Sequence, residues 1–147
     1  MRVREMTVVD AVAVAGLTGQ LGYPASAQQI EERFRGISRE ADSSVFVAEG
    51  DDGRLAGWIH VLARGFLELD RYVEIAGLVV DAGARRSGVG KALITEAERW
   101  ARERGCSTVR VRSNMVRVEA KPFYERMGYR VVKTQYVFEK TARAEVE

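Results

Sequence analysis

Residues 72–100 read YVEIAGLVV (72–80), DAGARRSGVG (81–90) and KALITEAERW (91–100). The first segment is apolar and rich in β-branched residues, which predicts a buried strand. From Val89 to Ala101 the apolar residues recur every three or four positions, which predicts an amphipathic helix. Between these elements lies a turn that contains Gly83, Gly88 and Gly90. The stretch therefore predicts a strand, a glycine-rich turn and a helix.

A helix that starts directly after a glycine-rich turn is suited to bind an anion. The N–H groups of its first turn have no helical acceptor, and the helix dipole favours negative charge there. Glycine also lets a ligand approach the backbone closely. Arg85, Arg86 and Lys91 add positive charge, although arginines in a turn can also simply be solvated. A ligand that carries phosphate is the first hypothesis.

Composition indicates a globular protein with mixed surface charge. The chain has 147 residues, which we expect to form one domain over residues 1–140, followed by a polar tail (141–147) that frays. Its 23 basic and 21 acidic residues give a net charge of +2, too small to favour a nucleic-acid partner.

Cysteine usage and hydropathy favour the cytoplasm. Cys106 is the only cysteine, so no internal disulfide can form, and we expect a small buried side chain rather than a nucleophile. No apolar run approaches the roughly 20 residues of a membrane span, so no membrane partner is expected. The sequence contains no Cys/His cluster, so no metal is expected.

The remaining segments predict an alternation of strands and helices. A strand is expected at 2–6, a helix capped by Thr7 after it, and a second helix from 26 or 27 to about 36. Strands follow at 44–49 and 54–63, joined by a turn at 51–53, and then a loop at 64–71. After residues 72–104 come a strand at 107–112, a helix at 116–127 and a strand at 129–139. The order βααβββαβαβ predicts an α/β fold, a mixed sheet flanked by helices on both faces.

The glycine-rich turn does not match two familiar phosphate motifs. Val89 stands where a P-loop has lysine, and Leu93 stands where a Rossmann fingerprint has its last glycine. What remains is R-x-x-G-x-G, formed by Arg85, Gly88 and Gly90. This pattern resembles the acetyl-coenzyme A loop of the GNAT superfamily of N-acetyltransferases. Residues 123–129 (FYERMGY) resemble a second segment of that family, F-Y-x-x-x-G-[FY].

The resemblance implies a GNAT-like fold with a V-shaped splay between the fourth and fifth strands. It also implies transfer of an acetyl group from acetyl-coenzyme A, in a ternary complex, to a primary amine of a small molecule or peptide. Homodimers are possible. The residues expected to contact coenzyme A are Leu78, Val79, Val80, Arg85, Arg86, Ser87, Gly88, Val89, Gly90, Lys91, Asn114 and Tyr124.

Two residues are candidates for proton transfer. Tyr124 matches the family's general acid, although a buried aromatic would also fit this position. Glu74 lies four residues before Leu78, and the histone-acetyltransferase branch of the family has a catalytic glutamate at the corresponding distance before the loop. Strict alternation would place Glu74 on the same face as Leu78 and Val80, where it could act as the base. Water relayed through Glu68 or Asp70 is the alternative.

Other residues allow weaker predictions. A histidine on such a strand is more often a packed or surface residue than a base, so His60 is not expected to be the base. Tyr23 and Tyr72 are candidates to line the acceptor pocket, and Ser87 is a candidate cap of the helix. The loop at 20–24 and the segment before Tyr72 are expected to select the acceptor, and Glu68, Asp70 and Glu74 would favour a cationic one.

Two other functions compete with this prediction. A non-catalytic sensor or scaffold could bind coenzyme A through the same loop. A nucleotide-binding domain of another class is the second alternative, which the broken phosphate motifs disfavour.

Overall fold

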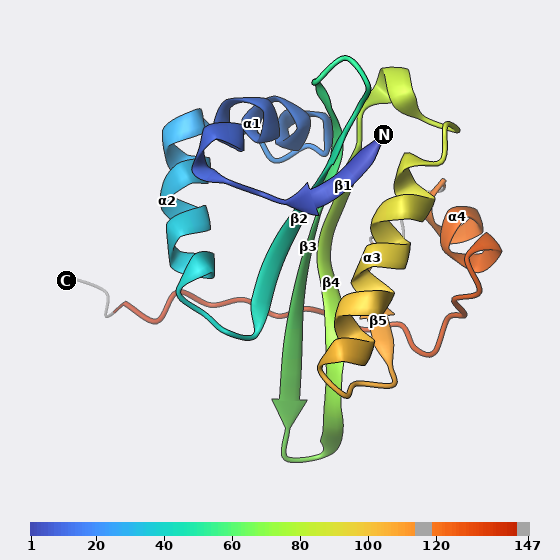
Figure 1. Ribbon diagram of the computed structural model, residues 1–147. Helices are drawn as coiled ribbons and strands as arrows, with labels where there is room; N and C mark the ends of the chain where they lie inside the picture. Colours follow the sequence, from blue (N-terminus) through green and yellow to red (C-terminus); the bar gives the residue numbers. More distant parts are fainter. Residues whose placement is uncertain (114–118, 144–147) are drawn as a thin grey trace. The chain divides into compact units, whose positions relative to one another are not determined.

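The computed structural model describes residues 1–113 and 119–143, which fall into two compact units, Met1–Arg112 and Ser113–Glu147. The elements of the first unit are β1 (Arg2–Glu5), the 3-10 helix η1 (Val8–Asp10), α1 (Ala11–Gln20), α2 (Ala27–Ser38), β2 (Ser43–Glu49), β3 (Leu55–Phe66), β4 (Leu69–Val80), the 3-10 helix η2 (Ala82–Ala84), α3 (Val89–Glu103) and β5 (Val109–Val111) (Figure 1). The second unit contains α4 (Ala120–Arg126). Within the described residues, no helix is both long and apolar enough to cross a bilayer.

The five strands form one mixed sheet in the order β1-β2-β3-β4-β5. The pairs from β1 to β4 are antiparallel, and β4 pairs with β5 in parallel. This arrangement confirms the predicted fold class of a mixed sheet flanked by helices.

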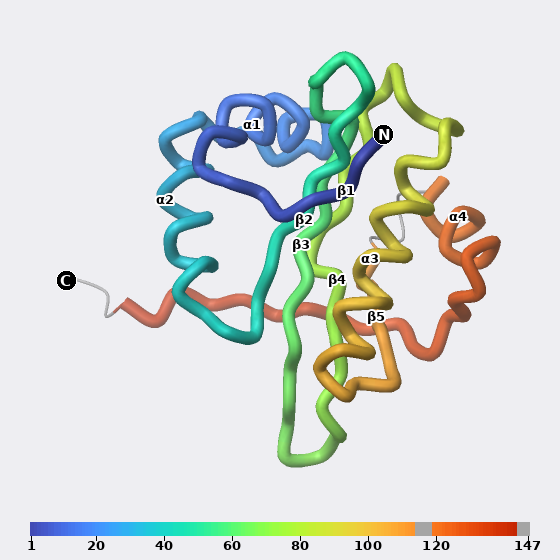
Figure 2. The backbone as a smooth tube through the Cα atoms, viewed as in Figure 1, coloured from blue at the N-terminus to red at the C-terminus, as the bar shows by residue number. Residues whose placement is uncertain are grey.

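The prediction of a loop at 64–71 is wrong, because β3 and β4 extend through most of this segment and form a long hairpin (Figure 2). Cross-strand pairs join Arg64 to Tyr72 and Phe66 to Leu69. The rings of Phe66 and Tyr72 stack with centroids 6.2 Å apart, and the Arg64 guanidinium lies 5.0 Å from the Phe66 ring centre. These contacts extend the strands although the segment's charged residues resemble a loop in the sequence.

The strand predicted at 129–139 is also absent: the structure assigns no strand to these residues. The segment has the valines and aromatic residues typical of strands, and Val131, Tyr136 and Phe138 are exposed. A strand also needs a neighbour for its N–H and C=O groups, and none of the described strands pairs with this segment. Strand propensity alone therefore gave the wrong prediction.

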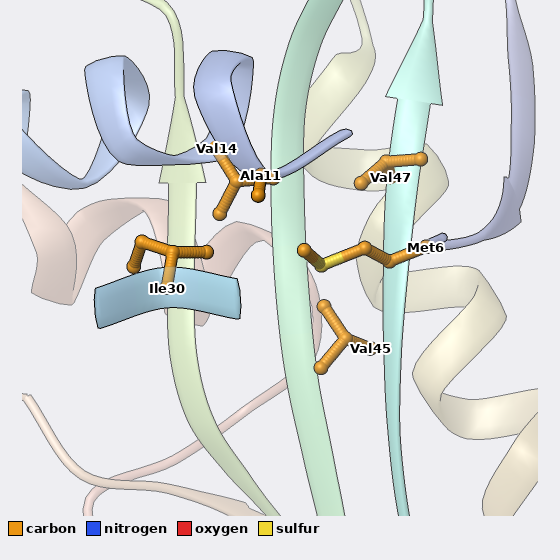
Figure 3. Close-up of a cluster of buried hydrophobic side chains, with 6 residues drawn as sticks. All are labelled: Met6, Ala11, Val14, Ile30, Val45 and Val47. Atoms are coloured by element: carbon orange, nitrogen blue, oxygen red, sulfur yellow. The ribbon is translucent and has the colours of Figure 1, made fainter. Parts of the chain in front are cut away.

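One face of the sheet packs against α1 and α2. The buried cluster of this face comprises Met6, Ala11, Val14, Ile30, Val45 and Val47 (Figure 3). Ser26 starts α2: its hydroxyl accepts the Gln29 N–H (3.1 Å), and the Gln29 side chain accepts the Ser26 N–H (2.9 Å). This capping box satisfies two polar groups at the helix start and fixes where α2 begins.

The opposite face of the sheet packs against α3. The helix buries the apolar residues that its periodicity predicted: Val89, Leu93, Ala97, Trp100 and Ala101. A Cβ atom on Gly57 of β3 would lie 3.1 Å from Leu93 and 3.2 Å from Val89. The start of α3 therefore lies close against β3, and this packing fixes the position of the glycine-rich turn.

Candidate functional site

The turn between β4 and α3 bends sharply through two residues with left-handed backbone. Arg86 has φ 66° and Gly88 has φ 86°. Gly88 is the residue that precedes α3, so the predicted capping role of Ser87 is wrong. The Ser87 hydroxyl instead donates to the carbonyl of Ala84 in the preceding turn. A glycine is favoured as the cap because a side chain is strained at a positive φ.

The first turn of α3 presents N–H groups that no described side chain caps. Within residues 1–113 and 119–143 no side-chain hydrogen bond caps the helix at Gly88, and the first helical hydrogen bond runs from the Ala92 N–H to the Gly88 carbonyl at 3.0 Å. The N–H groups of Val89, Gly90 and Lys91 therefore have no helical acceptor. Because α3 has 15 residues, its dipole places about half a positive charge at this end. The geometry is that of an anion site.

The surrounding charges favour the same kind of ligand. Arg85, Arg86 and Lys91 are exposed at this turn, and the first turn of α3 contains no acidic residue. The nearby acid, Asp81, is engaged: its Oδ2 accepts the Gly83 N–H at 3.1 Å. Backbone dipoles and basic side chains thus act together at the start of α3.

One edge of β4 is open beside this turn. β4 pairs with β5 only from Val73 to Ile75, opposite Val109 to Val111. Beyond Ile75, none of the described strands pairs with the β5 side of β4, which continues to Val80. The backbone of Leu78, Val79 and Val80 can therefore bond a peptide-like ligand as an added strand would.

A β-bulge interrupts β4 where the pairing with β5 ends. His60 pairs with Gly77 and Val61 with Ile75, so Ala76 is an extra residue without a partner on β3. The bulge shifts the alternation by one residue. Leu78 and Val80 therefore face α3, whereas Glu74 faces the α1 and α2 side of the sheet. The prediction that Glu74 shares a face with Leu78 and Val80 is wrong for this reason.

Trp58 covers the bulge on the side of Glu74. A Cβ atom on Gly77 would lie 2.8 Å from the Trp58 ring, so glycine is required for this close packing. The indole N–H is buried and has no hydrogen-bond partner among the described residues. The backbone at Gly77 is therefore backed by a rigid aromatic surface.

Glu74 is buried among arginines. Its exposed fraction is 8%, its Oε2 accepts a hydrogen bond from Arg64 Nη1 at 3.1 Å, and its Oε1 forms an ion pair with Arg112 Nε at 3.2 Å. The contact with Arg112 lacks hydrogen-bond geometry. Two guanidinium groups thus neutralise this carboxylate. Any role in proton transfer would require one of these ion pairs to loosen.

His60 lies on the same sheet face as Glu74. Its Nε2 is 3.0 Å from the Ser43 hydroxyl on β2. Burial lowers the pKa of His60, against the opposing charges of Glu40 and Glu74. His60 is therefore neutral near pH 7 and engaged with β2, as expected for a packed histidine.

The second unit contains residues 123–129, the second segment that resembles the acetyltransferase family. Tyr124 lies on α4, with its ring centre 5.1 Å from that of Phe123 and 6.0 Å from that of Tyr129. Its carbonyl accepts the N–H groups of Met127 and Tyr129 at 3.0 Å each. The predicted coenzyme A contact Asn114 lies outside the described residues.

The remaining candidate residues are either buried in the core or exposed on the surface. Tyr72 is buried, at 3% exposed, and the Arg110 guanidinium lies 4.9 Å from its ring centre. Tyr23 is 68% exposed in the loop after α1 and can contact a ligand. Cys106 is buried, as predicted. Among the described residues, no group of three His, Cys, Asp or Glu side chains could hold a metal ion.

The sequence reasoning missed one contact at the turn. Gln20, the last residue of α1, hydrogen-bonds both Asp81 and Ala82. The only sign of this contact in the sequence is a polar amide at the end of an apolar helix. Asp81 lies 61 residues further along the chain, so the sequence does not indicate it as the partner.

Comparisons with known proteins agree with the geometry. The family model described as "Acetyltransferase (GNAT) family" matches residues 17–129, most of the chain. An aminoglycoside N(6')-acetyltransferase type 1 from Stenotrophomonas maltophilia is 29% identical over 140 residues, which cover 86% of this chain and 84% of that protein. Streptothricin acetyltransferase from Streptomyces lavendulae is 36% identical over 90 residues, which cover 61% of this chain but only 46% of the relative. This chain therefore matches about half the length of that relative.

A solved structure shares the fold. The aminoglycoside N-acetyltransferase AAC(6')-Iy, in complex with coenzyme A, superposes with a TM-score of 0.79 and 21% sequence identity, covering 96% of this chain and 100% of that one. At this identity the similarity shows the fold alone. The family model matches residues 17–129, a range that includes both the glycine-rich turn and residues 123–129. The chain therefore belongs to the acetyltransferase (GNAT) family.

Proposed function

We propose that this protein transfers an acetyl group from acetyl-coenzyme A to a primary amine of a small molecule or peptide. The observation that carries the proposal is that the open edge of β4 leads directly to the uncapped start of α3. One run of main-chain groups can then bind two chemically different parts of a single ligand. Family membership supports this proposal.

The residues present fit coenzyme A. Its pyrophosphate matches the N–H groups of Val89, Gly90 and Lys91 and the basic side chains beside them. Its pantetheine arm contains amides that match the open edge at Leu78 to Val80, about 10 Å long at roughly 3.3 Å per residue. The structure of AAC(6')-Iy was solved with coenzyme A, which supports this donor.

The proposed reaction is a direct transfer within a ternary complex. The neutral amine attacks the acetyl carbonyl, so that a C–N bond forms as the C–S bond breaks. A backbone N–H near Leu78 or Val79 would polarise the carbonyl oxygen. Tyr124 would donate its proton to the departing thiolate, in keeping with its match to the family's general acid.

Removal of the amine proton requires a base, for which we retain Glu74. An alkyl amine has a pKa near 10, so it is protonated at neutral pH and must lose a proton before attack. Glu74 is buried on β4 two residues before the bulge, where the open edge begins. Its ion pairs with Arg64 and Arg112 oppose this role. Water relayed through Glu68 or Asp70, both on the exposed hairpin, is the alternative.

For the acceptor, we propose a small cationic molecule with several amines. Two relatives are named for streptothricin and for aminoglycosides, which are molecules of this type. The exposed Tyr23 and its loop after α1 offer a contact surface near the turn through Gln20. A peptide amine would be the other outcome of an acceptor screen.

Ligand-dependent thermal stability tests donor binding. We expect coenzyme A to raise the melting temperature of the protein more than ATP or NAD at equal concentration, because only coenzyme A combines a pyrophosphate with an extended arm of peptide-like secondary amides that can pair with a strand edge. A ligand at about 100 times its Kd stabilises by about 2.7 kcal/mol, which is readily detected. Equal or greater stabilisation by ATP or NAD would instead indicate a nucleotide-binding domain.

A further inference from the structure

Gln20 uses both ends of its side-chain amide to join two distant segments. Its Nε2 donates to Asp81 Oδ1 at 2.8 Å, and its Oε1 accepts the Ala82 N–H at 2.9 Å. One partner is an acceptor and the other a donor, so the amide has one favourable orientation. The contact links the end of α1 to the turn that follows β4.

On the donor side, the contact continues into the glycine-rich turn. Asp81 Oδ2 accepts the Gly83 N–H at 3.1 Å, and the Asp81 carbonyl accepts the Ala84 N–H at 2.9 Å. The Ala84 carbonyl in turn accepts the Ser87 hydroxyl, directly before Gly88. A short chain of hydrogen bonds thus runs from Gln20 to Ser87, next to the Gly88 that precedes α3.

On the other side, Gln20 adjoins the exposed loop after α1. The N–H groups of Leu21 and Tyr23 donate to the Thr18 carbonyl at 3.1 and 3.4 Å, and Gly22 turns the chain with φ 92°. The Thr18 hydroxyl is bonded to the Val14 carbonyl at 2.7 Å, so the last turn of α1 is fixed. The loop with Tyr23 is therefore attached to the helix end that holds Asp81.

We propose that Gln20 is a positioning residue that couples the acceptor loop to donor binding. Occupation of the α3 start by a pyrophosphate would fix the turn at Asp81 and Ala82. Gln20 would then hold the loop at residues 21–25 in place, so that the acceptor binds more tightly once the donor is bound. The inference rests on the proposed function for the identity of the two ligands. By thermodynamic linkage, the acceptor would strengthen donor binding by the same factor.

Hydrogen exchange of the loop tests the coupling without any turnover. We expect coenzyme A to slow amide exchange in residues 21–25 of the wild-type protein. In Gln20→Leu, which keeps a similar volume but removes both hydrogen bonds, coenzyme A should still bind but should leave exchange in this loop unchanged. Gln28→Leu, the same substitution at an exposed position on α2, should behave as the wild type.

Moving the carboxylate from position 81 to position 20 provides a rescue of the coupling. Gln20→Glu alone would place two carboxylates together and should abolish the coupling. In the double variant Gln20→Glu/Asp81→Asn, the new carboxylate can accept from both the Ala82 N–H and the introduced amide, whose oxygen still accepts the Gly83 N–H. This double variant keeps the net charge and should restore the slowed exchange. A side chain that only stabilises the fold would not show this pattern in the ligand-dependent difference.

Kinetics give a second measurement once an acceptor is known. We expect Gln20→Leu to raise the acceptor KM by about tenfold, within the usual range of coupling, with a small change in kcat. Two results would overturn the coupling and leave the proposed function intact. In the first, coenzyme A binds the wild type but does not slow amide exchange in residues 21–25. In the second, coenzyme A slows this exchange equally in the wild type and in Gln20→Leu. Failure of coenzyme A to bind the wild type would overturn both.

Discussion

Replacement of Gly57 by alanine tests how closely α3 and β4 are held at the proposed donor site. Gly57 lies on β3, opposite Val80 and facing α3. A Cβ atom there would lie 2.5 Å from the Val79 carbonyl oxygen, with Leu93 and Val89 at 3.1 and 3.2 Å. Because the closest atom belongs to the backbone of β4, no side-chain rotation relieves the clash.

The size of the effect follows from this distance. A shift of at least about half an ångström is needed at the strand or at the start of α3, and overpacking of this kind destabilises by about 1–3 kcal/mol. For a protein of this size, each kcal/mol lowers the melting temperature by about 2–4 °C. We therefore expect a decrease of roughly 2–12 °C. Displacement of Val79 and Val89 should also weaken coenzyme A binding by about tenfold, the effect of losing one charge-assisted hydrogen bond.

Thermal unfolding and calorimetric titration with coenzyme A measure the two effects. Gly36→Ala is the matched control, because a Cβ atom at this position on α2 meets nothing within 4 Å. The control should stabilise the helix by about 0.5–1 kcal/mol and leave coenzyme A affinity unchanged. If Gly57→Ala retains the wild-type melting temperature and affinity, the close packing of α3 against β3 cannot be what shapes the donor site.

Three further substitutions address catalysis and stability. Tyr124→Phe should lower kcat by about 10²-fold or more while coenzyme A affinity stays nearly constant; unchanged turnover would remove Tyr124 as the acid. Glu74→Gln should lower kcat and abolish its rise with pH if Glu74 is the base, whereas a lower melting temperature with an unchanged pH profile would leave it only an ion-pair role. The hydrogen bond from Arg4 lowers the pKa of Asp10, so this pair stabilises the fold above the unfolded pKa of about 4 and loses its effect as pH falls through the lower folded value. Asp10→Asn should therefore be less stable than the wild type at pH 7, and a difference that persists undiminished at about pH 2 would contradict this account.

The strand, turn and helix at the proposed donor site could be predicted from the sequence because their signals are local. Apolar periodicity placed α3, and the glycines placed the turn before it. The same local signals placed Ser26 before α2 and Gly53 (φ 81°) in the turn between β2 and β3. These features depend on residues a few positions apart, so no tertiary contact is needed to infer them.

The errors arose where distant contacts decide the structure. Glu74 was assigned to the wrong face because the bulge at Ala76 appears only when β4 is paired with β3. The sequence predicts a loop where β3 and β4 form a hairpin, because the stabilising pairs, such as Phe66 with Tyr72, form across strands. The contact between Gln20 and Asp81 spans 61 residues and has no periodic signal.

The central claim is that this chain acetylates an amine with acetyl-coenzyme A bound along β4 and α3. Free-thiol release from acetyl-coenzyme A, measured with a panel of aminoglycosides, streptothricin, polyamines and peptides, tests this claim most directly. We predict release that depends on the acceptor, with one thiol formed for each acetyl group found on the acceptor by mass spectrometry. Tight binding of coenzyme A without thiol release on any amine would contradict the claim and identify a sensor or scaffold that binds coenzyme A without turnover.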